Sequence, residues 1–243
     1  MNYKILIIIP AFNEAQRIAA VVAGARAAVP AGTVVVIDDG SADGTAAAAG
    51  AAGAVVVRHP FNLGYGVAIQ TGYKYALDSD CQLLVQIDGD GQHDPAGIPG
   101  LLEPLLRGEA DFVLGSRFLS GVSYRPPLVR RLGMAFFRRI VALVVRQPIS
   151  DCTSGFQAFN REVMGFFASD LFPCDYPDAD VLISLHLAGF RIREVPVRMT
   201  ANAAGKSMHS GIKPVYYVFK MLLSMLVTLL RSRRFYRRED VCR

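Results

Sequence analysis

Short apolar runs alternate with amphipathic stretches through the first 118 residues. Each run is rich in Val, Ile or Leu and is bounded by Gly, Pro or polar residues, which is typical of buried strands in a parallel sheet. The predicted strands are residues 4–9, 33–37, 55–58, 83–87 and 111–114. Helical periodicity fills the intervals, so the pattern predicts an α/β fold: a mostly parallel central sheet with right-handed crossovers and helices on both faces.

Polar residues predict where the first helices begin. Asn13 is expected to cap a helix whose buried face carries Ile18, Val21 and Val22. Either Ser41 or Asp43 is expected to cap an Ala-rich helix at residues 45–52. Further helices are predicted from the turn at residues 62–66 to about residue 77, and at residues 98–107, 128–145, 179–188 and 214–230.

The second half of the chain has a different character. Short strands are predicted within residues 151–159 and at residues 191–197. The last apolar stretch has 17 residues, 214–230, and contains Lys220, whereas a membrane span needs about 20 apolar residues. We therefore expect an interfacial helix followed by an arginine-rich tail on lipid headgroups, with a core-packing or homodimer helix as the alternative. This divides the chain into a main domain, residues 1–210, and a C-terminal extension, residues 211–243.

Charge is unevenly distributed along the chain. Residues 1–120 carry seven Lys/Arg and twelve Asp/Glu, a balance of −5, whereas residues 121–243 have a balance of +10. This asymmetry indicates an anionic partner for the second half, such as anionic lipid, a phosphorylated substrate or nucleic acid. Because the basic residues alternate with aliphatic ones and form no recognised reader motif, nucleic acid is not expected.

The cysteines and the amino terminus bear on the compartment. Cys81, Cys152, Cys174 and Cys242 show no CxxC spacing, and the apolar start at residues 5–10 is too short for a signal peptide. We expect reduced thiols, no zinc site and a cytoplasmic protein.

Two of the predicted strands end in aspartates. Asp38 and Asp39 follow one strand, and Asp88 and Asp90 follow another. Ligands bind at the carboxyl ends of strands in open α/β folds. Neighbouring carboxylates repel each other unless a cation lies beside them, and their oxygens suit Mg²⁺ or Mn²⁺, which usually accompany substrate phosphates. We therefore predict a divalent cation that holds a diphosphate; a polar Asp-Gly turn is the alternative.

An ordered set of motifs extends this prediction. The motifs are Ile9-Pro10-Ala11-Phe12-Asn13-Glu14, Ile37-Asp38-Asp39-Gly40-Ser41, Asn62-Leu63-Gly64, Asp88-Gly89-Asp90-Gly91-Gln92-His93, Gly115-Ser116-Arg117-Phe118, Thr153-Ser154-Gly155-Phe156 and Arg191-Ile192-Arg193-Glu194-Val195-Pro196-Val197. In order and spacing they resemble the family-2 glycosyltransferases with a GT-A fold, in the branch related to dolichol-phosphate mannose synthase. The resemblance runs from residue 4 to about residue 210 and implies that residues 1–210 form a GT-A domain.

The resemblance assigns one sheet end to the nucleotide of a sugar donor. It implies that Pro10, Ala11 and Glu14 line the nucleotide rim, that Asp38 lies near the ribose, and that Asp39 contacts the base. A carboxylate suits these places because it accepts hydrogen bonds from base N–H groups and sugar hydroxyls. The structural alternatives are a turn for Asp38 and favourable charge in a first helical turn for Glu14.

The same resemblance identifies a metal site. Asp88 and Asp90 match the family's DxD motif, with Asp88 also at the nucleotide and Asp90 acting in catalysis through Mg²⁺ or Mn²⁺. Gln92 falls where related mannose synthases supply a third ligand. His93 is expected to be a structural hydrogen-bonding residue rather than a ligand.

Candidate ligands of an acceptor phosphate are Arg117, Arg131, Ser154, Arg198 and Ser207. Arg117 can also clamp the donor diphosphate through both arms of its guanidinium and act in catalysis. Residues 198–210 resemble the flexible acceptor loop of the family. A solvent-facing strand end, a basic helix on lipid headgroups and a plain surface loop are the alternatives for these arginines.

Asp178 is the candidate general base. Counted back from Gly189 it matches the aspartate of the family's Glu-Asp motif, although Pro177 stands where the family has Glu, and Asp180 lies close by. Compensation of positive charge at a helix N-terminus is the alternative. A phosphate acceptor is already ionised, so a base is dispensable if the acceptor is a lipid phosphate.

The resemblance implies inverting, metal-dependent transfer of a sugar from GDP-mannose or a UDP-sugar to polyprenyl or dolichyl phosphate, by an enzyme peripheral to the inner face of the cell membrane. Alternatives are a polysaccharide, protein or small-molecule acceptor, and a non-catalytic sugar-nucleotide-binding module. A dinucleotide-binding oxidoreductase is rejected because no G-x-G-x-x-G turn follows the first strand.

Overall fold

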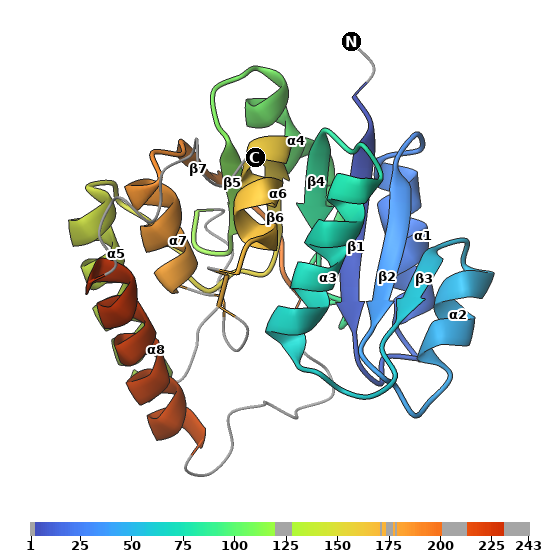
Figure 1. Cartoon of the computed structure of the whole chain (residues 1–243), viewed down its shortest axis with the longest axis horizontal. Helices are drawn as coiled ribbons and strands as arrows, with labels where there is room; N and C mark the ends of the chain where they lie inside the picture. Colours follow the sequence, from blue (N-terminus) through green and yellow to red (C-terminus); the bar gives the residue numbers. More distant parts are fainter. Residues whose placement is uncertain are drawn as a thin grey trace.

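The computed structural model describes residues 3–119, 128–170, 172–173, 177, 179–200 and 213–230, with only the backbone for residues 128–134 and 213–219. These residues form a sheet of seven strands in the order β3-β2-β1-β4-β6-β5-β7 (Figure 1). The strands are β1 (Ile5–Ala11), β2 (Thr33–Asp38), β3 (Val55–Arg58), β4 (Leu83–Gln86), β5 (Phe112–Ser116), β6 (Gln157–Asn160) and β7 (Ile192–Pro196). Only β6 is antiparallel to its neighbours, so the predicted mostly parallel sheet is confirmed for the described residues.

Helices cover both faces of the sheet, as predicted (Figure 1). One face packs against α1 (Ile18–Ala28), α2 (Thr45–Ala51), the 3₁₀ turn η1 (Pro95–Gly97) and α4 (Ile98–Leu106). The other packs against α3 (Tyr65–Asp78), α5 (Leu128–Val145), α6 (Arg161–Ala168) and α7 (Ala179–Leu187). Strand β1 shows why: Ile7 and Ile9 face one layer, Leu6 and Ile8 face the other, and all four are buried.

The prediction for the first helix cap was wrong. Helix α1 begins at Ile18, five residues after Asn13, and Arg17 precedes it without a side-chain cap. Asn13 has a φ of 58°, a left-handed conformation that Asn tolerates, and its Oδ1 accepts the N–H of Ala42. Its side chain thus joins two loops at the end of the sheet. At the second helix, Asp43 rather than Ser41 accepts the N–H of Thr45.

The last helix, α8 (Lys213–Leu230), packs on α7. Met221 and Met225 are buried against the domain, and the Ser224 hydroxyl donates to Asp180 of α7. The outward side chains are apolar and exposed: Leu222, Leu223, Leu226, Val227, Leu229 and Leu230. Among the described residues, no helix combines the length and the apolar character needed to cross a membrane. The arginine-rich tail lies outside the described residues.

Candidate active site

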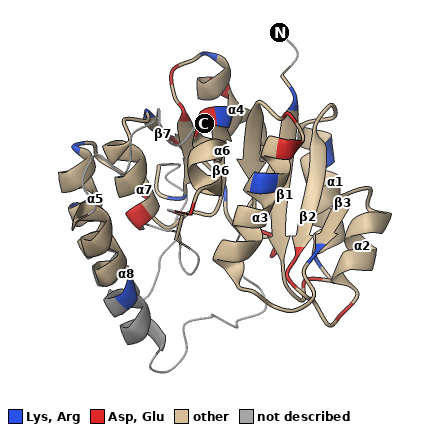
Figure 2. Ribbon diagram, viewed as in Figure 1, with Lys and Arg blue, Asp and Glu red and all other residues tan. Residues whose placement is uncertain are grey.

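The register of β1 brings the two acidic strand ends together. Ala11 is opposite Asp38 on one side, and the Asp39 N–H donates to the Ala11 carbonyl at 2.9 Å. On the other side, the Gly89 N–H donates to the Pro10 carbonyl at 3.3 Å. Asp38 and Asp39 therefore flank the carboxyl end of β1 opposite the loop that carries Asp88 and Asp90, as predicted. Figure 2 shows acidic residues in the loops at this end of the sheet.

Asp39 organises the loop that follows β3. Asp39 is 3% exposed, and its carboxylate accepts the N–H groups of Leu63 and Gly64, each at 2.9 Å. His59 Nδ1 lies 2.8 Å from the same carboxylate, and His59 Nε2 lies 3.0 Å from the Thr71 hydroxyl. The Asp39 carboxylate has about four acceptor positions, and three of them are thus used within the protein. Its main structural effect is to fix residues 62–64 at the rim of the sheet.

Asp38 is buried in the turn after β2. Its Oδ1 accepts the Ser41 N–H at 3.1 Å, and Oδ2 lies 3.1 Å from Arg58 Nε, in a geometry that is not a hydrogen bond. Gly40 is required in this turn: its φ is +71°, and a Cβ there would lie 2.5 Å from the Phe61 carbonyl carbon. These contacts give Asp38 the turn role that the sequence left open.

The other predicted nucleotide residues lie along the same edge. Pro10 and Ala11 are the last residues of β1 and are buried. Glu14 donates its N–H to the Thr45 hydroxyl at 2.8 Å, and its carboxylate pairs with Arg17. Glu14 precedes the helix rather than lying within its first turn, so its alternative role as a helix-dipole residue is weakened.

Asp88, Asp90 and Gln92 are close neighbours in the loop after β4. Asp90 accepts the Gln92 N–H at 3.0 Å and also a hydrogen bond from the Gln92 side-chain amide. Burial raises the pKa of Asp88, an effect that the Tyr65 hydroxyl and Arg117 partly offset. Burial also raises the pKa of Asp90, and the neighbouring Asp88 charge raises it further. For both carboxylates, the nearby hydrogen bonds and positive charges thus do not fully offset the effect of burial on the negatively charged form.

The residues present fit a divalent cation. Gly155 lies against Asp88, where a Cβ would come within 2.5 Å of Oδ2, so only a glycine lets the backbone approach this carboxylate so closely. No three His, Cys, Asp or Glu side chains in the described part of the chain are grouped closely enough to hold a metal alone. Two carboxylates and one amide supply only part of an oxygen shell, which suits an ion that shares its ligands with a substrate diphosphate.

His93 differs from its expected role. The ring is 3% exposed and packs on Phe156, and among the described residues its Nδ1 has no hydrogen-bond partner. Its Nε2 lies 3.8 Å from Asp88 Oδ2. Burial, and next the charge of Arg117, lowers the pKa of His93 to about 4, so the imidazole is neutral at pH 7.

Arg117 is held by a carboxylate that the sequence did not single out. Its Nε and Nη2 donate to the two oxygens of Asp151, both at 2.6 Å, and Nη2 also donates to the Thr153 hydroxyl. Glu194 of β7 in turn accepts the N–H groups of Ser150 and Asp151. Because these partners come from three distant segments, no local pattern indicates the network. The bidentate contact that was predicted between Arg117 and a phosphate is therefore made with Asp151 instead.

Two of the remaining acceptor candidates, Ser154 and Arg198, lie next in the chain to residues that contact Arg117. Ser154 is buried, and its Oγ accepts the Phe156 N–H at 3.3 Å. Arg198 is exposed, and its carbonyl accepts the Asp94 N–H, next to a bridge between His93 and Met199. Asp178 and Ser207 lie outside the described residues, as does the side chain of Arg131. Asp180 is buried and bonded to α8.

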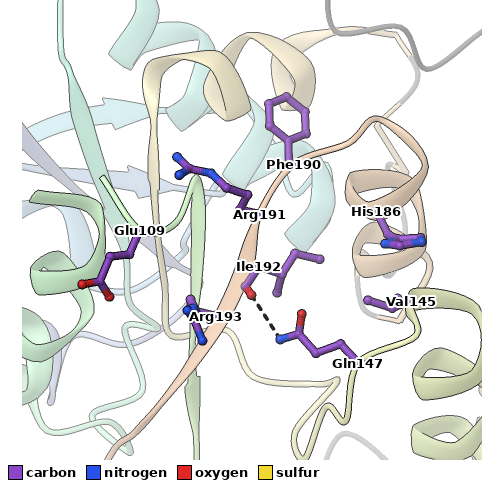
Figure 3. Close-up of a pocket in the computed structure, with 8 residues that line it drawn as sticks. All are labelled: Glu109, Val145, Gln147, His186, Phe190, Arg191, Ile192 and Arg193. Atoms are coloured by element: carbon purple, nitrogen blue, oxygen red, sulfur yellow. Dashed lines mark hydrogen bonds between the residues drawn. The ribbon is translucent and has the colours of Figure 1, made fainter. Parts of the chain in front are cut away.

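A cavity of about 280 Å³ lies at the other end of the sheet (Figure 3). Ile192 and Arg193, at the start of β7, line it together with the ends of α5 and α7, and Gln147 donates to the Ile192 carbonyl at 3.1 Å. No predicted site residue lines this cavity, so it is separate from the acidic loops.

The sheet order and the acidic strand ends define a GT-A glycosyltransferase, an enzyme that uses a nucleotide-sugar donor. The chain belongs to glycosyl transferase family 2, whose model matches residues 6–166. It is 31% identical over 229 residues to polyprenol monophosphomannose synthase of Mycolicibacterium smegmatis, covering 90% of this chain and 85% of the relative. It is 30% identical over 220 residues to undecaprenyl-phosphate mannosyltransferase of Micrococcus luteus, covering 86% and 88%.

Solved structures share the fold. Glucosyl-3-phosphoglycerate synthase from Mycobacterium tuberculosis, in complex with Mn²⁺, uridine diphosphate and phosphoglyceric acid, superposes with a TM-score of 0.66 at 24% identity. The match covers 94% of this chain and 78% of that one. The expected GT-A fold is thus confirmed, and the two relatives above support the expected branch related to dolichol-phosphate mannose synthase.

Proposed function

We propose that this enzyme transfers a hexosyl group from a nucleoside diphosphate sugar to a polyprenyl phosphate, with a divalent cation at Asp88, Asp90 and Gln92. The observation that carries the proposal is that the two acidic strand ends lie at the same end of the sheet, one on each side of β1. The acceptor is inferred from the relatives, two of which are named for lipid phosphates.

The chemistry is a single displacement at the anomeric carbon. An oxygen of the acceptor phosphate forms the new bond to this carbon, the bond to the donor diphosphate breaks, and the nucleoside diphosphate departs with the electron pair, inverting the configuration. A bound Mg²⁺ or Mn²⁺ would neutralise charge on the departing diphosphate. The acceptor phosphate is already ionised, so the reaction does not depend on Asp178 as a base.

The chain's own residues would orient the reactants. Asp39 fixes the loop of residues 62–64 beside the nucleotide, and Pro10 and Ala11 form the buried floor of the rim. Arg117 acts on the charges of Asp88 and His93, which indicates that its positive charge is felt in the acidic loop. Arg198 precedes Met199, whose sulfur lies 3.9 Å from Arg117 Nη1, and the two arginines would favour an anionic acceptor there.

Transfer of radiolabelled sugar from GDP-mannose and UDP-glucose into a lipid extract tests the reaction. We expect label in polyprenyl phosphate, and Asp90→Ala should reduce the rate at least about a hundredfold, since the cation would lose a carboxylate ligand. Asp78→Asn, an exposed change at the end of α3, is the control.

An undiminished rate for Asp90→Ala would refute the metal assignment. Label in phosphoglycerate or another water-soluble product would show that the acceptor is not a polyprenyl phosphate. Nucleotide binding without any turnover would favour the non-catalytic alternative.

We also propose peripheral contact of α8 with the inner face of the cell membrane. Its outward side chains are apolar, and α5 contributes exposed Arg138 and Arg139, which suit anionic headgroups. The double variant Leu223→Ser/Leu226→Ser should sediment less with anionic vesicles while its melting temperature stays the same. Leu106→Ser removes an equally exposed leucine from α4 and should bind vesicles normally. If the double variant binds vesicles as the wild type does, α8 is not the contact.

A further inference from the structure

Gln86 is a buried amide in an otherwise apolar strand. It ends β4, is 1% exposed, and follows Leu83, Leu84 and Val85. Its Nε2 lies 3.0 Å from the Tyr65 hydroxyl and 3.1 Å from the Gly155 carbonyl oxygen. Its Oε1 accepts a hydrogen bond from the Tyr73 hydroxyl. The side chain is therefore hydrogen-bonded to three residues, two in α3 and one in the loop before β6.

The direction of these hydrogen bonds follows from one group. The Gly155 carbonyl can only accept, so the amide nitrogen of Gln86 must face it, and the amide oxygen must face Tyr73. The second N–H of the amide then donates to the Tyr65 oxygen. Tyr65 has a single hydroxyl proton, which is left for Asp88 Oδ1, 2.9 Å away. Gln86 thus orients the proton of Tyr65 toward Asp88.

Both groups bound by the Gln86 amide nitrogen also touch Asp88. Tyr65 donates to Oδ1, and Gly155 packs against both carboxylate oxygens so closely that a Cβ would lie 2.5 Å from Oδ2 and 2.8 Å from Oδ1. The Gln86 amide therefore fixes Tyr65 and Gly155, two groups that contact the Asp88 carboxylate. The hydrogen bond from Tyr65 occupies one lone pair of Oδ1 and leaves the other lone pairs of the carboxylate for a cation.

We propose that Gln86 and Tyr65 are positioning residues that act through Asp88, holding its carboxylate in the orientation that binds the cation and donor diphosphate. The inference rests on the proposed role of Asp88 in cation binding. Neither residue touches the reacting atoms. Their effect is on the affinity of the acidic loop for the cation and on the alignment of the leaving diphosphate.

Tyr65→Phe tests the inference because it removes the hydroxyl and keeps the ring, which is 39% exposed. We expect Mn²⁺ affinity, measured by electron paramagnetic resonance with UDP or GDP present and no acceptor, to fall about 10–100-fold, as for other outer-shell partners of metal ligands. In the transfer assay the Mn²⁺ concentration at half-maximal rate should rise by the same factor. Tyr75→Phe, which removes a phenol ten residues further along α3, should match the wild type.

Gln86→Glu provides a second, independent variant. The introduced carboxylate cannot donate, so the Tyr65 hydroxyl would turn to it and leave Asp88. We expect the same loss of Mn²⁺ affinity as for Tyr65→Phe, and no further loss in the double variant, because both changes remove one hydrogen bond. Additive losses of Mn²⁺ affinity would show that Gln86 and Tyr65 do not act on Asp88 through one series of hydrogen bonds.

The controls separate this inference from the proposed function. If Asp88→Asn and the wild type bind Mn²⁺ equally, the cation site itself is wrong. If Asp88→Asn abolishes binding while Tyr65→Phe, folded by circular dichroism, binds as the wild type does, the cation site stands and the positioning role is refuted.

Discussion

Arg117 and Asp151 form a two-point ion pair that is almost completely buried. Both N–O distances are 2.6 Å, and the side chains are 6% and 0% exposed. The pair joins the end of β5 to the loop before β6, beside the acidic site. Asp151 therefore holds Arg117 in place without a bound phosphate.

Asp151→Leu should destabilise the fold strongly. Removal of one partner leaves the Arg117 charge buried and unpaired, which typically costs about 3–5 kcal/mol. Urea unfolding followed by circular dichroism measures this loss. Glu103→Gln breaks the exposed Glu103–Arg107 pair, whose side chains are 57% and 62% exposed, and should change stability by less than about 1 kcal/mol. Equal effects of the two changes would show that Arg117 is solvated.

Gly155→Ala should impair the acidic site more than the fold. The new Cβ overlaps Asp88, and the carboxylate can rotate away more easily than the backbone can move. Displacement of a substrate-positioning group by about 1 Å can reduce turnover about a hundredfold. Gly100→Ala, in α4 with open space around it, should keep full activity and gain about 0.5–1 kcal/mol from helix propensity. A fully active Gly155→Ala enzyme would mean that the orientation of Asp88 is not critical.

Asp39→Asn should loosen the loop of residues 62–64. An amide cannot accept at its nitrogen, so one of the Leu63 and Gly64 N–H groups faces a donor. We expect a loss of about 1–3 kcal/mol in stability and a higher KM for the nucleotide sugar. Faster amide hydrogen exchange at Leu63 and Gly64 would locate the effect. Unchanged exchange there would mean that other contacts hold the loop.

Cys81 should make the fold sensitive to alkaline pH. Its thiol is wholly buried, and burial raises its pKa from 9.0 to about 11. The folded protein thus holds this proton more tightly than the unfolded chain, so the contribution is fully present below pH 9 and is lost as the pH rises through about 11. The two-unit difference corresponds to at most about 2–3 kcal/mol.

Urea unfolding at several pH values between 8 and about 11 measures this effect. Cys81→Ala is less stable at pH 8 because it leaves a cavity, but its free energy of unfolding should fall less steeply with pH than that of the wild type. Parallel curves for the two proteins would show that the thiol titrates normally in the folded state.

Most of the fold could be predicted from local pattern. The strands and helices of the first 118 residues are bounded by Gly, Pro and polar residues, and the apolar runs between them are long enough to be buried. The end of the sheet that holds Asp39 and Asp88 follows from the parallel order of β2, β1 and β4. What the pattern does not encode is the pairing between distant segments, such as the position of β6.

The same limit explains the site residues that were missed. Gln86 carried a usable signal, since a polar residue inside a buried strand must find partners. Asp151 carried no signal, and the motif at residues 191–197 gave no role for Glu194, because both roles depend on the loop before β6 lying beside β5 and β7. Asn13 was misassigned because a residue that favours helix caps also tolerates the left-handed turn at the sheet rim.

The place of β6 in the sheet has a consequence for synthesis on the ribosome. β4 and β5 emerge first, yet β6, between them, is made about forty residues after β5 (residues 157–160 against 112–116). Until then the nascent chain carries two strand edges with open backbone groups, which are templates for aggregation. Fragments that stop before residue 157 should therefore be insoluble, and a split enzyme would have to be divided after β6 rather than in the long connection that precedes it.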